Sequence, residues 1–155
     1  MSIRYRFAQL SDSSKILSWR NEESVRLSSR NQALISIDQH NSWFTARVTN
    51  IQNEPILIFS NENIDIGFTR LDMIKPSNRT FDVSIAVSAS FRNLGFGSSM
   101  LSSTKEVART FLGVDEINAT VREGNQASLK LFTASGFKVF ETHAGFVKLR
   151  FSLSE

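Results

Sequence analysis

A turn with two glycines one residue apart, Gly95 and Gly97, carries the residue types best suited to chemistry in this sequence. The alternating, β-branched run from Phe81 to Val87 before it predicts a strand, and apolar residues at helical spacing from Met100 to Phe111 predict a helix after it. Such a junction directs free backbone N–H groups and the positive end of a helix dipole to one point. Glycine lets an anion approach that backbone, and Arg92 adds a charged donor for phosphate oxygens. The pattern therefore predicts a pyrophosphate cradle.

A second block, residues 118–140 (NATVREGNQASLKLFTASGFKVF), places an asparagine, small residues, Leu-Phe and a final Gly-Phe behind another predicted strand. This block resembles the later half of the GNAT acetyltransferase superfamily, and the Arg-x-x-Gly-x-Gly run at 92–97 resembles its acyl-CoA loop. A lone glycine-rich turn before a helix is often only a helix start. The two blocks stand in the order and at the distance of the superfamily, and together they make the resemblance specific.

The elements expected around these blocks follow one another without repeats, linkers or low-complexity segments. Strands are expected at 4–7, 55–60, 64–71, 81–87, 116–121, 137–142 and 146–153. Helices are expected from Ser11 or Asp12 through Trp19, in a second short stretch to Arg26, from Ser36 to about Thr49, after the glycine turn, and at 126–134. With the first two stretches counted as one, the order β-α-α-β-β-β-α-β-α-β-β is that of the superfamily. The resemblance implies an α/β (α+β) GNAT fold, a mixed central sheet of about seven strands splayed after the fourth, with flanking helices.

Composition describes one ordinary globular domain over residues 1–155, with 41% apolar and 21% charged residues. No apolar run approaches membrane-spanning length and the first residues lack a secretory signal, so we expect a cytoplasmic protein without a membrane partner. The absence of cysteine excludes disulfides and thiolate chemistry. A net charge of +3 suits an anionic small ligand as well as RNA. Because lysine and arginine form no basic stripe, no nucleic-acid partner is expected.

The resemblance implies acetyl-CoA as co-substrate and assigns residues to it. The pyrophosphate loop would comprise Arg92, Asn93, Leu94, Gly95, Phe96, Gly97 and Ser98. In the family, backbone groups of the preceding strand, here Ile85, Ala86 and Val87, bind the pantetheine amides and polarise the thioester carbonyl. The same three residues would equally suit a strand core.

Two positions in the later block bear on the coenzyme as well. Asn125 matches the family's asparagine at the coenzyme arm, and asparagine is equally suited to cap a helix. Phe132 stands where many relatives carry a tyrosine that protonates the leaving thiolate. Phenylalanine cannot donate a proton, so we expect Phe132 to be an apolar wall, with the acid supplied by water or another group, or not needed because a thiolate leaves readily.

A general base is expected at one of two carboxylates, or in water alone. Asp82 matches the position where several relatives carry a glutamate that acts through water, and Glu123, just past the fifth strand, is the second choice. Most carboxylates at strand ends are simply solvated. His40 and His143 are the only histidines; His143 could reach the acceptor, but the pair makes no credible metal site, and no metal is expected.

The amino-terminal third is expected to bind the acceptor amine. It resembles a pattern of N-acetyltransferases that act on nucleotide-linked 4-amino sugars, notably the pseudaminic acid pathway enzyme that modifies UDP-4-amino-4,6-dideoxy sugars. The residues that carry this likeness are Trp19, Arg20, Asn21, Arg26, His40, Trp43 and Phe44. Arginines such as Arg20, Arg26 or Arg30 would bind the diphosphate, and the aromatic rings would offer flat surfaces. Alternatively, Trp43 or Phe44, with Ile37 and Val48, forms the buried face of an amphipathic helix.

Three functions follow from these residues. The first is acetyl transfer from acetyl-CoA to the amine of a nucleotide-linked amino sugar, directly in a ternary complex and without a covalent enzyme intermediate. The second is acetylation of a protein N-terminal amine, as in the ribosomal-protein N-acetyltransferases. The third is a non-catalytic acyl-CoA-binding module, suggested by Phe132. A homodimer is compatible with the sequence.

Overall fold

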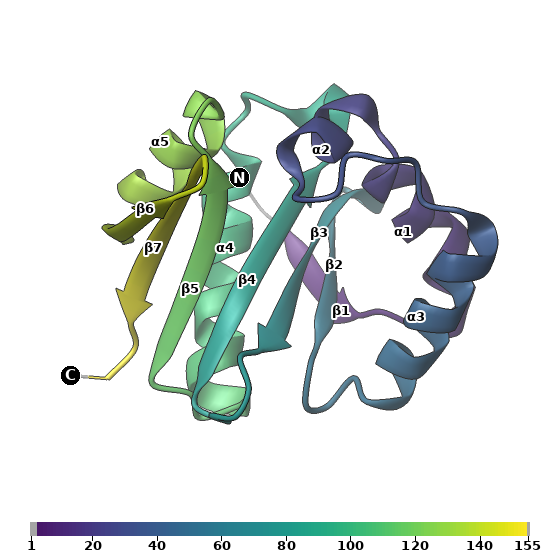
Figure 1. The fold of residues 1–155 in the computed structure, drawn as a ribbon. Helices are drawn as coiled ribbons and strands as arrows, with labels where there is room; N and C mark the ends of the chain where they lie inside the picture. The colour runs from purple at the N-terminus through teal and green to yellow at the C-terminus, as the bar shows by residue number, and fades with distance from the viewer. Residues whose placement is uncertain (1–2, 155) are drawn as a thin grey trace.

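A seven-stranded mixed β-sheet organises the computed structural model, which describes residues 3–154 (Figure 1). The strands are β1 (Arg4–Phe7), β2 (Ile56–Asn61), β3 (Ile64–Met73), β4 (Thr80–Val87), β5 (Glu116–Arg122), β6 (Lys138–His143) and β7 (Phe146–Ser152). Their order is β1-β2-β3-β4-β5-β7-β6, and neighbouring strands pair antiparallel except for the parallel pair β4–β5. The mixed sheet predicted from the sequence is confirmed, and β1 lies at one of its edges.

Five helices accompany these strands in the described part of the chain: α1 (Ser13–Arg20), α2 (Glu23–Ser28), α3 (Ile37–Thr49), α4 (Phe96–Glu106) and α5 (Gln126–Ala134). Two of them begin at the side-chain caps that the sequence suggested. Ser36 Oγ accepts the N–H of Gln39 at 3.2 Å at the start of α3, and Asn125 Oδ1 accepts the N–H of Ser128 at 3.1 Å at the start of α5. Each cap satisfies one of the donors that a helix leaves free in its first turn.

Asp12 stands at the N-cap position of α1, as expected, but its side chain does not cap the helix, because its carboxylate pairs with Arg6 at 2.8 Å and accepts the N–H of Gln9. One local expectation about the helices is wrong. Ile37 is 66% exposed instead of lying on the buried face of α3. Phe111 is also exposed, because α4 runs into a wider π-helical turn, Val107–Phe111, that rotates this ring off the core-facing side.

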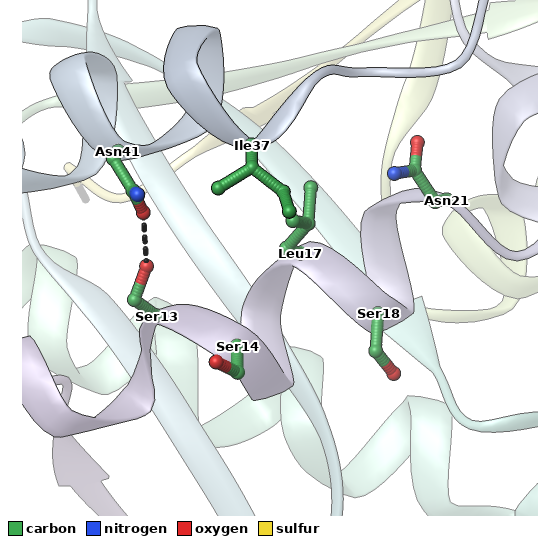
Figure 2. A pocket seen from close by; sticks show the side chains of 7 residues that line it. All are labelled: Ser13, Ser14, Leu17, Ser18, Asn21, Ile37 and Asn41. Carbon is green, nitrogen blue, oxygen red and sulfur yellow. Dashed lines mark hydrogen bonds between the residues drawn. The ribbon is translucent and has the colours of Figure 1, made fainter.

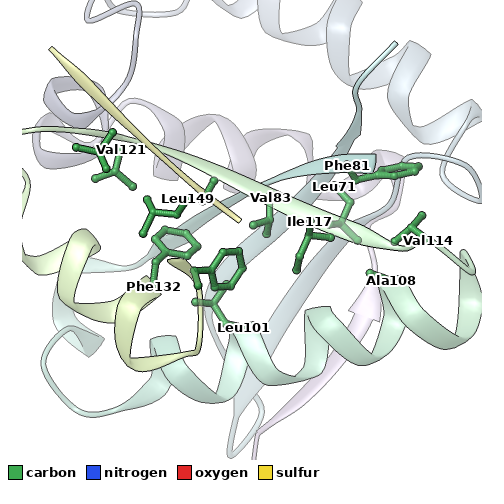
Figure 3. Close-up of a cluster of buried hydrophobic side chains, with 13 residues drawn as sticks. Leu71, Phe81, Val83, Leu101, Ala108, Val114, Ile117, Val121, Phe132 and Leu149 are labelled. Atoms are coloured by element: carbon green, nitrogen blue, oxygen red, sulfur yellow. The ribbon is translucent and has the colours of Figure 1, made fainter. Parts of the chain in front are cut away.

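Helices cover the two faces of the sheet unequally (Figure 1). On one face α1 and α3 pack over the β1–β3 half, through the cluster Ala8, Ile16, Trp19, Phe44, Ile56, Ile58, Phe68 and Ala86. On the other face α4 and α5 cover the largest cluster, which gathers side chains from β3, β4, β5 and β7 (Figure 3). Because side chains alternate along a strand, Asp82 and Ser84 of β4 point away from that cluster, toward the thinly covered face. No helix within residues 3–154 is long and apolar enough to cross a membrane.

The parallel strands β4 and β5 lie together at one end and diverge at the other (Figure 1). Their register pairs Thr80 with Glu116, Phe81 with Ile117 and Asp82 with Asn118, and pairing stops there although both strands continue. On its other side β4 stays paired with β3 as far as Val87. The predicted splay after the fourth strand is therefore confirmed, and residues 84–87 present a backbone edge to the gap.

A buried arginine ties α3 to the sheet below it. Arg47 is 7% exposed, its Nε donates to the carbonyl of Glu54 and its Nη2 to the carbonyl of Leu71, both at 2.7 Å. Its Nη1 lies 2.6 Å from Asp72 Oδ1. Removing this side chain would leave two carbonyls without their donor and would take from Asp72 the closer of its two arginine partners, which costs more than the pair itself contributes.

We expect Arg47→Met to lower the free energy of unfolding by about 3 kcal/mol, because it leaves buried acceptors unpaired. Arg47→Lys keeps the charge but lacks the planar fork and should give an intermediate loss. Urea denaturation followed by circular dichroism measures both. The matched control is Arg4→Met at the exposed edge strand, which should change stability by less than about 0.5 kcal/mol. A loss below about 1 kcal/mol for Arg47→Met would contradict the assignment.

Candidate functional site

The gap between β4 and β5 opens into a cleft of about 800 Å³. Its walls come from β3, β4, β5, α2 and the loop after it, the glycine turn with the start of α4, and α5. Most of the predicted coenzyme residues lie on these walls: Ile85, Ala86, Val87, Arg92, Asn93, Gly95, Phe96, Gly97, Ser98, Asn125 and Phe132. Leu94 does not, because its side chain is 54% exposed on the outside of the turn. Segments far apart in sequence thus meet at one cavity.

The glycine turn delivers the first turn of α4 to this cleft. Gly95 occupies the N-cap position with φ of +84°, in the left-handed region that other residues rarely adopt. It has no side chain to accept from the first turn, in contrast to the caps Ser36 and Asn125 of α3 and α5. The first amides of α4 therefore keep their hydrogen-bonding capacity for another acceptor, at the positive end of the helix dipole.

Gly97 lies close to a neighbouring helix and also lines the cleft. A Cβ at this position would stand 3.2 Å from Cδ2 and 3.3 Å from Cδ1 of Leu131 on α5. Both residues line the cleft, so the missing side chain lets α5 approach the start of α4 closely. The sequence pattern alone assigned this glycine to anion approach and gave no sign of the contact with Leu131.

Arg92, predicted to be a phosphate donor, is already occupied by protein groups. Its Nε donates to the carbonyl of Val87 at 2.9 Å, Nη1 donates to Ser24 Oγ, and Nη2 lies 2.6 Å from Glu22 Oε2. These contacts fasten the start of α2 to the end of β4. In this structure the arginine joins two walls of the cleft, and three of its five N–H groups are directed to protein acceptors.

A second arginine fastens the far end of the same segment to β5. Arg122 donates from Nε and Nη2 to the carbonyl of Ser29 at 2.9 and 2.7 Å, and Asn125 Nδ2 donates to Ser28 Oγ at 3.0 Å. Arg30 Nη2 reaches Thr120 Oγ1 at 3.3 Å. The α2 segment therefore spans the divergent ends of β4 and β5 and closes one side of the cleft.

Asp82 lies on the cleft wall at the last residue of β4 that still pairs with β5. Its cross-strand neighbour on β3 is Asp72 and its neighbour on β5 is Asn118. The pKa of Asp82 is raised to about 6, mainly by burial and next by the negative charge of Asp72, although the positive charges of Arg30, Arg70 and Lys148 act in the opposite direction. A carboxylate with a pKa close to neutral, facing a cavity, is suited to accept and release protons.

Glu123, the second candidate base, stands apart from this arrangement. Its side chain is exposed, it lies beyond the end of β5, and it is not among the residues that line the cleft. The reason is the turn that follows β5, in which the Glu123 N–H bonds to the carbonyl of Gly145 at 3.0 Å. The structure therefore brings Asp82 to the cleft and not Glu123.

Among the predicted acceptor-binding residues, only Arg20, Arg26 and Arg30 line the cleft. Trp19 is a core residue, 6% exposed and stacked on Phe68 with ring centroids 5.9 Å apart, so its proposed role as a substrate surface is wrong. Asn21 is a structural tie, since its side chain exchanges two hydrogen bonds with the backbone of Ile35 at 3.0 and 2.8 Å.

His40 and Trp43 do not line the cleft, but both contact Arg20, which does. His40 is fully buried; its Nε2 faces the carbonyl of Ser13 at 2.9 Å, so Nε2 carries the proton and Nδ1 accepts from Arg20 Nη1 at 3.2 Å. Burial and the nearby Arg20 charge lower the pKa of His40 and keep it neutral. Arg20 rests on the Trp43 ring, 4.3 Å from its centroid. The sequence predicted that these two residues contact the substrate directly. In the structure they contact Arg20 and support it instead.

Sequence reasoning missed Arg70 and Asp72, which also line the cleft. Both follow Phe68 at alternate positions of β3, and register places them opposite Ser84 and Asp82. The signal was present as two charged residues at a period of two in the second half of the strand. Finding their role required the pairing register of β3 with β4, which a single sequence does not display.

A second, smaller hollow of about 430 Å³ lies between α1 and α3 (Figure 2). Ser13 Oγ donates to Asn41 Oδ1 at 2.9 Å across it, and the side chains of Leu17 and Ile37 meet between the helices. Its lining holds serine, asparagine, leucine and isoleucine side chains, with neither a charged group nor an activated nucleophile. Nor do three His, Cys, Asp or Glu side chains gather as metal ligands anywhere in residues 3–154.

Comparison with known proteins agrees with this geometry. Residues 3–138 match the family model for the acetyltransferase (GNAT) domain. Similar solved structures include YncA of Salmonella typhimurium, described as an acetyltransferase with its cofactor acetyl-CoA, at 21% identity and TM-score 0.83, covering 100% of this chain and 96% of that one. They also include the ribosomal-protein-alanine N-acetyltransferase of Brucella melitensis, at 21% identity and TM-score 0.81, covering 96% of this chain and 99% of that one. A third is the Vibrio cholerae spermidine N-acetyltransferase in complex with CoA and spermine, at 15% identity and TM-score 0.84, covering 97% of this chain and 95% of that one. A comparison with curated protein sequences gives no match.

We expect Asp82→Asn to stabilise the fold at pH 8. A folded-state pKa above the ordinary value means that the protonated acid is favoured in the folded protein, so stability is lost as pH rises through about 6. The variant removes this loss and should raise the free energy of unfolding at pH 8 by about 3 kcal/mol.

The same comparison at pH 4.5, measured by urea denaturation, is the control. There the folded wild type already carries protonated Asp82, and the gain should largely disappear. Equal stabilities of the two proteins at pH 8 would show that Asp82 is an ordinary solvated carboxylate.

Proposed function

This chain belongs to the GNAT acetyltransferase family, and we propose that it transfers the acetyl group of acetyl-CoA to the amine of a nucleotide-linked amino sugar. One observation carries the proposal: the open amides of α4, the unpaired edge of β4 and a set of arginines all face one cleft. The first two suit a coenzyme, and the third suits an anionic acceptor.

The coenzyme half of the cleft uses backbone groups for recognition. The pyrophosphate binds at the first turn of α4, where amides and helix dipole converge. The pantetheine arm lies along residues 84–87 of β4 in the manner of an added strand, with Phe132 as its apolar wall. Phe132 is 3% exposed and packs edge to face on Phe137 with centroids 5.0 Å apart, so this wall is rigid. The bound coenzyme of the Salmonella typhimurium structure supports acetyl-CoA as the donor.

Acetyl transfer then proceeds directly between two bound substrates. The amine nitrogen attacks the thioester carbonyl carbon, the C–N bond forms, and the carbon–sulfur bond breaks with release of the CoA thiolate. A backbone N–H of the β4 edge stabilises the oxyanion in between. The proton lost by the amine passes to Asp82, directly or through water, and the thiolate needs no phenol because it is a good leaving group near neutral pH.

The acceptor half of the cleft is rich in arginine. Arg20, Arg26, Arg30 and Arg70 line it, against the two carboxylates Asp72 and Asp82. This balance favours an acceptor with negative charge, such as a sugar diphosphate, over a polycation. A peptide N-terminus is the alternative acceptor, and the Brucella melitensis ribosomal-protein-alanine enzyme shares the fold. The two are separated by an acetylation assay with UDP-linked 4-amino sugars, alanine-starting peptides and spermidine as parallel acceptors.

In that assay we expect turnover with the UDP-linked amino sugar, at a kcat/KM at least about a hundredfold above that for the peptide or spermidine, since opposite charge assists binding and like charge opposes it. Preferred acetylation of the peptide would replace the sugar with the N-terminal amine. Binding of acetyl-CoA without turnover on any amine would favour the binding module suggested by Phe132.

Gly97→Val should weaken acetyl-CoA binding at least about tenfold, because a side chain beside the first turn of α4 obstructs the backbone approach of the pyrophosphate. The same variant presses on Leu131, so the double variant Gly97→Val/Leu131→Ala separates the two effects. Thermal stability should recover in the double variant while the coenzyme Kd, measured by calorimetry, stays high. Leu131→Ala alone is the matched control. A double variant that binds acetyl-CoA as tightly as this control would refute the cradle.

The rate should depend on pH through the base. With Asp82 as base, kcat/KM for the amine should rise with pH through about 6, where Asp82 loses its proton. Asp72→Asn removes a negative charge beside Asp82 and should move this limb to lower pH, while the limb set by the amine itself stays in place. Asp82→Asn should abolish the acid limb and lower kcat by about 100-fold with acetyl-CoA affinity unchanged. An acid limb that survives in Asp82→Asn would assign the base to another group.

A further inference from the structure

Arg20 is a cation in the cleft wall, and no carboxylate within residues 3–154 forms an ion pair with it. Its described partners are the Trp43 ring, 4.3 Å from the guanidinium carbon, and His40 Nδ1 at 3.2 Å, both of which are uncharged. Asp72, the acidic residue whose charge raises the pKa of Arg20, is already bound by Arg47 at 2.6 Å and approached by Arg70 at 3.2 Å. An arginine in such a place normally pairs with an anion.

The structure holds Arg20 in one orientation. Trp43 supports its flat face, and neutral His40, whose tautomer is fixed by the Ser13 carbonyl, accepts one of its N–H groups. His40 is fully buried and stacks on Phe44 with ring centroids 5.4 Å apart, so this acceptor cannot turn away. The remaining N–H groups of Arg20 stay available toward the cleft that it lines.

Arg70 stands beside Arg20 over the same indole. Its guanidinium carbon lies 5.4 Å from the Trp43 centroid, and its side chain also lines the cleft. Arg70 Nε is buried without a hydrogen-bond partner among the described residues, although Asp72 Oδ2 lies 3.2 Å away. Burial together with the positive charge of Arg70 lowers the pKa of Arg20 to about 10. The positive charges of Arg20 and Arg70 thus lie over the same ring, and Arg70 also carries a buried donor without a hydrogen-bond partner among the described residues.

We propose that Arg20 and Arg70, on the Trp43 shelf, form an anion subsite for the acceptor, which binds a phosphoryl or carboxylate group of the substrate whose amine is acetylated. The subsite rests on the proposed function, because it presupposes that this half of the cleft takes the acceptor. It adds to the proposed function the two guanidinium groups, those of Arg20 and Arg70, that select an anionic amine as the acceptor. Arg70 lies opposite Ser84, one alternate position from the Asp72–Asp82 pair, so the bound anion lies close to the base.

The test is calorimetric binding of inorganic pyrophosphate and of succinate to the protein saturated with CoA, at fixed ionic strength. CoA fills the first turn of α4, so further anion binding reports on the acceptor half. We expect one of the two probes to bind, and Arg20→Gln and Arg70→Gln each to weaken it at least about tenfold, because each removes a charge-assisted hydrogen bond. Arg4→Gln, on the exposed edge strand, should leave the affinity unchanged.

The outcomes distinguish the anion subsite from the proposed function on which it rests. Pyrophosphate binding assigns the subsite to a phosphoryl group; binding of succinate alone assigns it to a carboxylate and counts against the nucleotide sugar. Both support the subsite if the arginine variants weaken them while CoA affinity and melting temperature stay within about twofold and a few degrees of wild type. If CoA binds but neither probe does, or the variants bind as wild type does, the subsite is overturned and the coenzyme assignment stands. Failure to bind CoA removes the proposed function and the subsite with it.

Discussion

The divergence of β4 from β5 is the constraint on which the rest of this structure depends. Two parallel strands that pair over three residues and then separate leave main-chain donors and acceptors without a strand partner. Buried backbone groups in such a gap need water or a ligand to satisfy them. The fold keeps the gap open by pairing β4 fully with β3 on one side and β5 with β7 on the other. A cleft formed in this way is a property of the sheet, and loops only complete it.

The arginines fall into two groups with opposite tasks around that gap. Arg92 and Arg122 donate to protein acceptors and fix the α2 segment across the open ends of the strands. Arg47 does the same for α3 and leaves Asp72 anchored. Arg20 and Arg70 line the cavity, and among the described residues neither donates to a backbone carbonyl. Net charge alone could not distinguish these tasks, since an arginine bound to carbonyls and one free to bind a ligand contribute equally to it. The hydrogen bonds and ion pairs of each arginine show which of the two tasks it has.

Much of the architecture was accessible from sequence because it is encoded locally. Alternation marked the strands, Ser36 and Asn125 marked helix starts, and the glycine turn marked the junction of β4 with α4. The candidate site was accessible only where it is made of consecutive residues, as at 92–98. Trp19, Asn21 and His40 were misread because a tryptophan, an amide or a histidine can face a ligand or the core, and burial decides between the two. Arg70 and Asp72 were missed because strand register, which depends on the whole sheet, brings them beside Asp82.

The most direct measurement of the central claim is hydrogen exchange, resolved by residue, with and without saturating acetyl-CoA. If the coenzyme completes the open edge of β4 and the first turn of α4, amides within residues 84–87 and 95–98 should exchange at least about tenfold more slowly in its presence, since they gain hydrogen-bond acceptors. Exchange that stays unchanged in both segments while acetyl-CoA is bound would mean that the coenzyme lies elsewhere, and would contradict this account of the cleft.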